Sequence, residues 1–263
     1  MEILAHRTAM DNAPPNSLEG FCFCGEKGIK IIECDLSFSY DGQPVIWNDH
    51  DNHLLQRPIR SIGEHTLYEL QKRERKDSDE FLLGIGDIWN FLQDHPKCRV
   101  LFDVKYYSRD LWGIVKRIPT HLVRLTLQEV IEPAITLKLI NQIGFVTFEG
   151  GVRLLKTVKD VLPEIHTNLM VVWPWARISG HLNYLDGITI GWDGWNHWQK
   201  IFARSAERLI LTARESGLKV WGGHANSLEN RQWLVDSGFN GMWTNDIVTA
   251  KKYLEELDLR LLV

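Results

Sequence analysis

Three short polar segments of this chain carry residue types that could perform phosphoryl chemistry, and each lies at the end of an apolar, β-branched run. They are Ala5-His6-Arg7, Ile32-Glu33-Cys34-Asp35 and Asp103-Val104-Lys105. If the runs are parallel strands, their carboxyl ends converge on one place, as in an α/β barrel. A histidine, three carboxylates and a lysine would meet there, enough to bind a divalent cation and a phosphate. The pattern therefore indicates metal-assisted phosphodiester chemistry.

The acidic residues have the spacing of a strand. Glu33 and Asp35 are two residues apart, so on a strand both point to one face, where two buried like charges need a neutralising partner. Asp103 and Lys105 repeat this spacing. We predict a divalent metal held by Glu33, Asp35 and Asp103, with Lys105 neutralising them or binding a phosphate oxygen. The alternatives are a carboxylate that points to solvent at the rim and a structural ion pair between Asp103 and Lys105.

His6 ends the first predicted strand, beside Arg7. A single histidine at the end of a strand is more often structural than catalytic. Together with the carboxylates, His6 becomes a candidate nucleophile or general base, and Arg7 a candidate phosphate ligand.

The bulk properties restrict the class of protein. The net charge of −4 and the lack of a Lys/Arg cluster argue against nucleic acid as a partner. No run of 18 apolar residues is present, so no membrane span is expected. The N-terminus lacks the features of a signal peptide. The four cysteines have no zinc-ligand spacing, which favours reduced thiols and a cytoplasmic location.

Strand-like and helix-like stretches alternate along the chain, which is typical of parallel strands; eight such repeats make a TIM (β/α)8 barrel. Strands are predicted near 2–6, 30–37, 99–105, 122–130, 143–148, 168–173, 187–191, 218–222 and 240–244. Helices are predicted near 17–27, 64–76, 86–94, 109–117, 134–141, 151–160, 198–216, 227–236 and 247–257. Nine strands are one too many, and the excess strand is expected within 122–148. No linker is apparent, so we predict one α/β domain over 1–263 with a small hairpin insertion at about 40–62.

Several motifs together resemble the glycerophosphodiester phosphodiesterases over nearly the whole chain. The matching segments are Ala5-His6-Arg7, Ala13 to Phe21, Ile32 to Leu36, Asp41 to Ile46, Leu101 to Lys105, Gly217 to Trp221 with Asn226, and Gly241 to Asn245. The resemblance implies a TIM barrel, a Mg²⁺ or Ca²⁺ ion, and cleavage of a phosphodiester by paired histidines.

Two departures from that family concern the catalytic groups. Pro15 stands where the family has a metal-ligating glutamate, but the related spider-venom sphingomyelinase D enzymes manage without it, so the three-carboxylate set still suffices. Asn48 stands where the family has the histidine that protonates the leaving group, and an asparagine is no acid. His50, two residues on, is predicted to take over this role, with His53 as the weaker alternative.

A third departure concerns the substrate. Gly223 replaces a tryptophan of the family, which would open the mouth of the barrel. Tryptophans on other loops would then form a platform for a sugar or a quaternary ammonium group, or else pack the outer helices together; these are Trp173, Trp175, Trp192 and Trp195. The predicted substrate contacts are Arg7, Asn48, Lys105, Trp173, Trp221 and His224.

The combined prediction is a divalent-metal phosphodiesterase acting on a small-molecule glycerophosphodiester or sugar phosphodiester. His6, His50 and Lys105 are its predicted catalytic residues. The product would be a phosphomonoester or, if a hydroxyl of the substrate attacks, a cyclic phosphate; the reverse, synthetic reaction is also open. The alternative from another class is a barrel that binds a phosphodiester without turnover, which Asn48 and Pro15 favour. The sequence makes no prediction of the oligomeric state.

Overall fold

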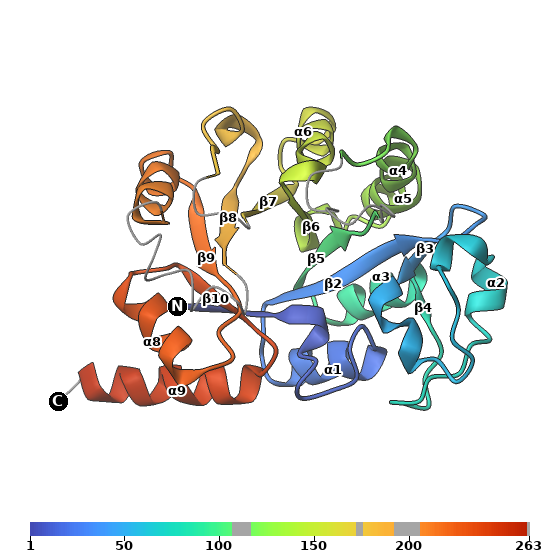
Figure 1. Ribbon diagram of the computed structural model, residues 1–263, viewed down its shortest axis with the longest axis horizontal. Helices are drawn as coiled ribbons and strands as arrows, with labels where there is room; N and C mark the ends of the chain where they lie inside the picture. Colours follow the sequence, from blue (N-terminus) through green and yellow to red (C-terminus); the bar gives the residue numbers. More distant parts are fainter. Residues whose placement is uncertain (107–116, 172–175, 192–205, 262–263) are drawn as a thin grey trace.

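The computed structural model describes residues 1–106, 117–171, 176–191 and 206–261. At its centre lies a closed barrel of eight parallel strands (Figure 1). In chain order the strands are β1 (Glu2–Ala5), β2 (Ile31–Phe38), β5 (Arg99–Val104), β6 (Ile143–Phe148), β7 (His166–Val171), β8 (Gly187–Ile190), β9 (Lys219–Gly222) and β10 (Gly241–Thr244). Each pairs with the next, β10 pairs with β1, and pairing of β1 with β2 closes the ring. The predicted TIM barrel is confirmed.

Helices surround the barrel (Figure 1). They are α1 (Leu18–Glu26), α3 (Ile85–Asp94), α4 (Thr120–Leu125), α5 (Glu132–Thr136), α6 (Val152–Val161), α8 (Leu228–Asp236) and α9 (Ile247–Leu261), and residues 206–215 are also helical. The predicted helix starts at Ser17 and Ser227 are confirmed, since each hydroxyl accepts a hydrogen bond from the backbone three residues on. The predicted helix 109–117 lies mostly outside the described residues.

The strand predicted at 122–130 is wrong, because this segment is helical. It forms α4, a π-helical turn (Thr126–Ile131) and α5 in succession. Its buried side chains are Val123, Thr126, Val130, Ile131 and Ala134. They recur every three to four residues, which is the helical period, whereas the β-branched composition favoured a strand. Removing this strand leaves eight, as the barrel requires.

An insertion follows β2 and extends further than the predicted 40–62. Strand β3 (Pro44–Ile46) pairs antiparallel with β2, as predicted, and β4 (Leu83–Gly84) pairs antiparallel with β3. Between them lie the 3-10 helices η2 (Asp49–Leu54) and η3 (Ile62–Glu64) and the short α2 (Leu67–Leu70), which is all that forms of the predicted helix 64–76. The insertion has an apolar core of its own around Trp47 and Leu55.

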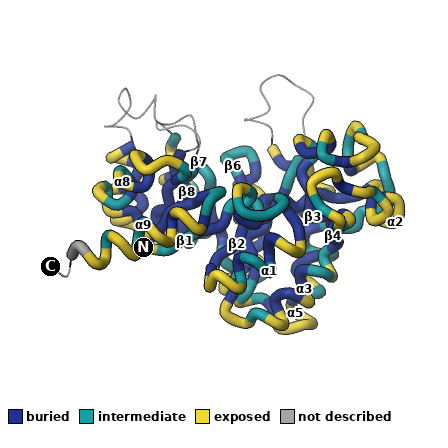
Figure 2. Tube along the Cα trace, turned by 90° about the horizontal axis from the view of Figure 1, so that it is seen from below, coloured by how far each residue is buried: buried dark blue, intermediate teal, exposed yellow. Residues whose placement is uncertain are grey.

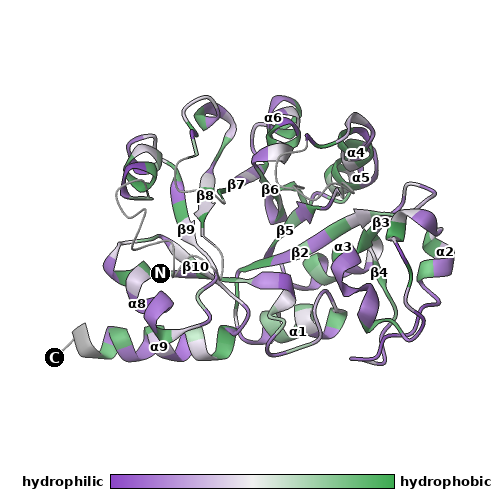
Figure 3. Ribbon diagram, viewed as in Figure 1, coloured by the Kyte–Doolittle hydropathy of each residue, from purple (hydrophilic) through white to green (hydrophobic). Residues whose placement is uncertain are grey.

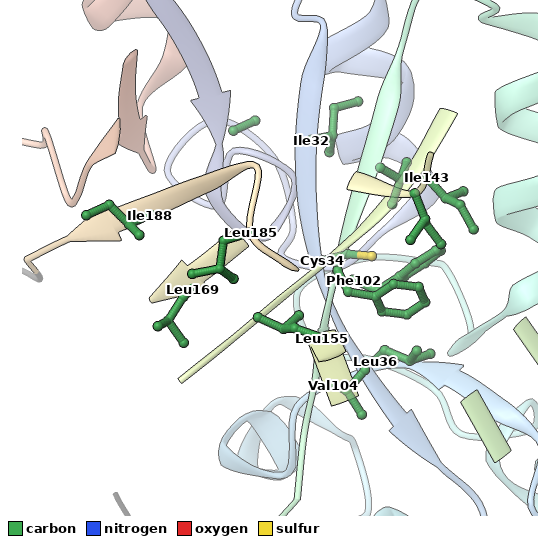
Figure 4. Packing of buried hydrophobic residues seen from close by; sticks show 14 of the residues in the cluster. Ile32, Cys34, Leu36, Phe102, Val104, Ile143, Leu155, Leu169, Leu185 and Ile188 are labelled. Atoms are coloured by element: carbon green, nitrogen blue, oxygen red, sulfur yellow. The ribbon is translucent and has the colours of Figure 1, made fainter. Parts of the chain in front are cut away.

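Two apolar layers hold the barrel together. The outer one lies between strands and helices, where Ile32, Cys34 and Phe102 pack (Figure 4). The other fills the barrel interior and includes Leu4 and Trp243. Burial is continuous along β2 (Figure 2), yet hydrophilic residues interrupt its hydrophobic ones (Figure 3). Ile32, Cys34 and Leu36 of β2 pack in the outer layer, so Glu33 and Asp35, which alternate with them, point into the barrel.

No helix among the described residues has the length and apolarity needed to cross a membrane, in agreement with the sequence.

Candidate active site

Three carboxylates meet at the carboxyl end of the barrel strands. Asp35 on β2 and Asp103 on β5 are register partners, and Glu33 lies two residues before Asp35. Their side chains are buried, and one oxygen from each lies within 4.8 Å of the others. The predicted ligand set is thus brought together, because parallel pairing of β2 with β5 aligns two inward-facing positions.

Two cations lie among these carboxylates. Lys105 Nζ is 2.6 Å from Asp35 Oδ1 and also donates to Asp103 Oδ2. Arg7 Nε is 2.9 Å from Asp35 Oδ2, and its Nη2 contacts Asp51 of η2. The sequence analysis did not place Asp51 in this cluster.

The charges in this cluster shift one another's protonation. Burial and then the charge of Asp35 raise the pKa of Glu33 well above its usual range. Burial also raises the pKa of Asp103. Although burial opposes it, Lys105 and Arg7 together lower the pKa of Asp35. Burial therefore disfavours the ionised forms of Glu33 and Asp103, and a hard cation bound to their oxygens would reverse that effect.

His6 follows β1 and faces the cluster. Its Nδ1 lies 2.6 Å from Asn245 Oδ1, which can only accept, so Nδ1 carries the proton in the neutral ring. Its Nε2 is 3.9 Å from Glu33 Oε2. Burial and then His224 lower the pKa of His6 well below its usual range. A neutral imidazole with Nε2 available toward the cluster can act as a general base. Asn245, which the sequence analysis did not single out, fixes this orientation.

A hydrogen bond to the carboxylate cluster holds the turn that follows His6 in place. Arg7 has φ 50°, in the left-handed region that non-glycine residues seldom adopt. Its N–H donates to Glu33 Oε2 over 2.8 Å. One glutamate thus positions both Arg7 and, through it, the end of the strand that carries His6.

A second histidine lies against the first. The ring centroids of His6 and His224 are 4.2 Å apart, at an interplanar angle of 32°. His224 follows β9 and is half-buried. His224 was predicted to contact the substrate, and the structure places it against His6, the candidate base.

Asn48 also points into the cluster. Its Nδ2 donates to Asp35 Oδ2 over 3.1 Å, and Asn16 makes a second amide contact to the same oxygen over 3.0 Å. The side chain of His50 is exposed, and its backbone N–H donates to Asn48 Oδ1. His53 is exposed as well. The structure thus brings Asn48, rather than His50, into the carboxylate cluster.

Trp221 lies at the other end of the barrel from the cluster. It is 1% exposed, and its indole N–H donates to Glu2 Oε2 at the start of β1. This position does not fit the predicted contact with substrate. Gly223 lies directly against Trp243, since a Cβ built there would be 3.2 Å from the Trp243 Cβ, so the missing side chain opens no space in that direction. The predicted platform residues, Trp173, Trp175, Trp192 and Trp195, lie outside the described residues.

Comparison with known proteins identifies the family. The model of the glycerophosphoryl diester phosphodiesterase family matches residues 6–249. The chain belongs to this family. It is accordingly a phosphoric diester hydrolase, and the resemblance inferred from the sequence motifs is confirmed. No curated protein matches the chain.

Solved structures show the same fold at low sequence identity. One is a Silicibacter pomeroyi protein assigned as a glycerophosphoryl diester phosphodiesterase (15% identity, TM-score 0.80, covering 98% of this chain and 94% of that one). Another is an Oleispira antarctica phosphodiesterase in complex with its product sn-glycerol-3-phosphate (17%, 0.76, 97% of each). A third is a glycerophosphodiester phosphodiesterase from Parabacteroides distasonis (15%, 0.72, 98% of each).

Proposed function

We propose that this chain hydrolyses a small glycerophosphodiester, or a sugar phosphodiester of similar size, with the help of one divalent cation. The observation that carries the proposal is the buried cluster of Glu33, Asp35 and Asp103 beside His6. The products are an alcohol and a phosphomonoester, or a cyclic phosphate if a hydroxyl of the substrate attacks.

The donor set fits a hard cation. All three donors are buried carboxylates whose oxygens lie within 4.8 Å of one another, and Mg²⁺ and Ca²⁺ prefer oxygen ligands. Burial, and to a smaller extent the charge of Asp35, raise the pKa values of Glu33 and Asp103, so each carboxylate would be favoured by a bound cation. When bound there, Mg²⁺ or Ca²⁺ would supply Lewis-acid polarisation of the phosphoryl group.

The remaining residues of the site have roles that follow from their charges and orientations. Lys105 and Arg7 bind the phosphate oxygens and stabilise the negative charge of the transition state. His6 accepts the proton of the attacking water or hydroxyl at Nε2, because Asn245 holds the proton on Nδ1. Asn48 is held by Asp35, near enough to the cluster to contact a phosphate oxygen.

The substrate class follows the family. The Oleispira antarctica relative was solved with sn-glycerol-3-phosphate as product, which supports a glycerol phosphate moiety here as well. Glycerophosphodiesters are deacylated phospholipids, so the activity would belong to lipid metabolism. A cytoplasmic location also stays a prediction; the four cysteines are unbridged, as a reducing compartment requires.

The test is turnover of a substrate panel by the purified chain with Mg²⁺, Mn²⁺ or Ca²⁺ and with EDTA. The panel comprises glycerophosphocholine, glycerophosphoglycerol, a sugar phosphodiester and bis-p-nitrophenyl phosphate. We expect metal-dependent turnover of at least one glycerophosphodiester. Calorimetric binding of the metal without any turnover would instead favour the binding-only alternative that Asn48 suggests.

A further inference from the structure

The leaving alcohol needs a proton, and the position that supplies it in the resembled family is an asparagine here. Asn48 occupies that position and donates to Asp35, so it is oriented as a hydrogen-bond donor to a carboxylate. An amide cannot transfer a proton as an acid. His50, two residues on, has an exposed side chain. Another side chain is therefore required beside the phosphate.

His224 is placed beside the candidate base by the closure of the barrel. It follows β9, which pairs with β10, and β10 in turn pairs with β1, the strand that leads to His6. The ring centroids of the two histidines are 4.2 Å apart. Strands from opposite ends of the chain thus place two imidazoles at one edge of the carboxylate cluster.

The backbone around His224 is firmly held. The carbonyl of His224 accepts from Asn230 Nδ2 over 3.1 Å, and the next residue, Ala225, donates to the Trp243 carbonyl over 2.7 Å. The Ala225 carbonyl in turn accepts from Arg231 Nε over 2.9 Å. Contacts from α8 and β10 therefore fix the loop on both sides, as a catalytic group that must keep its position requires.

The separation of the rings matches the geometry of phosphoryl transfer. The attacking and leaving oxygens lie roughly in line on either side of phosphorus in the transition state. Two side-by-side imidazoles can each reach one of these oxygens if the line between the oxygens runs parallel to the line between the rings. The centroid distance of 4.2 Å places the two rings side by side, as this arrangement requires.

We propose that His224 is the general acid of this enzyme and protonates the leaving alkoxide opposite His6. The proposal rests on the proposed phosphodiesterase function and names the residue that completes it. In this enzyme the general acid thus comes from the loop after β9. In the resembled family it comes from the segment that corresponds to the residues after β3 of this chain.

Water attacks phosphorus while His6 Nε2 accepts one proton of the water. The bond between phosphorus and the alcohol oxygen breaks, its electron pair stays on that oxygen, and the oxygen takes a proton from the His224 imidazolium. The products are an alcohol and a phosphomonoester, after which His6 releases a proton to solvent and His224 regains one.

The experiment compares two leaving groups in His224→Ala and His224→Gln. An alkoxide from a glycerophosphodiester needs the proton, whereas p-nitrophenolate is stable at neutral pH without it. We expect kcat on the best glycerophosphodiester to fall by about 10²–10⁴-fold, the usual contribution of a general acid, with a much smaller loss on bis-p-nitrophenyl phosphate. Metal binding by calorimetry and the melting temperature report on folding. His121→Ala, on the exposed face of α4, is the matched control.

Three outcomes would overturn the proposal. Equal losses on both substrates in both variants would make His224 a structural residue. A loss of glycerophosphodiester turnover in His50→Ala, without such a loss in the His224 variants, would identify His50 as the general acid instead. Wild-type protein that turns over neither substrate with any metal would refute the proposed function itself, and the role of His224 with it; an active wild type separates these failures.

Discussion

The two ends of the barrel both carry charged side chains, arranged in different ways. At the amino end of the strands two carboxylates each have a cation: Glu2 Oε1 is 2.8 Å from Lys219 Nζ, and Asp186 Oδ2 is 2.8 Å from Lys159 Nζ. At the carboxyl end, among the described residues, four buried carboxylates face two cations. The carboxylates are Glu33, Asp35, Asp51 and Asp103, and the cations are Arg7 and Lys105.

The charged side chains at the two ends of the barrel therefore have different roles: those at the amino end stabilise the fold, and those at the carboxyl end form the candidate active site. The pairs at the amino end hold strands and loops together, and Trp221 closes that end as an apolar layer bonded to Glu2. The excess of buried carboxylates at the carboxyl end is unfavourable for the folded chain alone and becomes favourable once a cation binds. Charge imbalance, more than charge itself, therefore distinguishes the end of the barrel that carries the candidate active site.

The largest expected effect comes from removing one charge at the carboxyl end. Glu33→Gln keeps an oxygen for the Arg7 N–H but removes a metal ligand, so turnover should fall by at least about 10³-fold. The melting temperature of the metal-free protein should rise, because a neutral amide avoids the cost of burying the Glu33 carboxyl group beside Asp35. Kinetics and thermal unfolding in EDTA measure both effects.

Glu2→Gln is the matched variant at the other end. It removes the partner of Lys219, so it should lower the melting temperature and leave turnover unchanged. If the two variants changed stability in the same direction, the contrast between the two ends would be refuted.

An intermediate effect is expected in the pH dependence of stability. Burial, and then the charge of Arg99, lower the pKa of His166 on β7 to about 4. The unfolded histidine, with a pKa of about 6.5, takes up a proton first as the pH falls. The free energy of unfolding should therefore decrease between about pH 6.5 and pH 4, by at most about 3 kcal/mol.

His166→Gln should remove this part of the pH dependence. Urea unfolding of both proteins at several pH values between 4 and 7 measures it. Equal slopes in the variant and the wild type would show that His166 does not titrate as its burial implies.

The smallest effect is expected for Trp221→Phe. A six-membered aromatic ring is retained, but the hydrogen bond to Glu2 is lost, and this loss alone should lower the free energy of unfolding by about 1 kcal/mol. KM for the best substrate should not change, because the indole lies at the amino end of the barrel. A raised KM with unaltered stability would return Trp221 to the substrate site, where its sequence position had suggested it.

Local patterns in the chain were enough to predict the barrel and the clustering of the three carboxylates. Buried parallel strands appear as apolar runs, and the carboxylates of β2 interrupt such a run at every second position. The same reasoning failed at 122–130, where β-branched composition favoured a strand and the spacing of the buried residues produced a helix. The composition of this segment favoured a strand, but its buried residues have helical spacing, and the segment packs against the barrel as a helix.

The sequence by itself determined which strands carry the candidate catalytic residues and which family the chain belongs to. It also determined the alternation that points Glu33 and Asp35 to one face. Only the tertiary structure decided which side chains meet. His6 bonds Asn245, 239 positions away, and touches His224, because barrel closure places β10 between β1 and β9. Contacts of this kind depend on the register of distant strands, which no local pattern in the chain encodes.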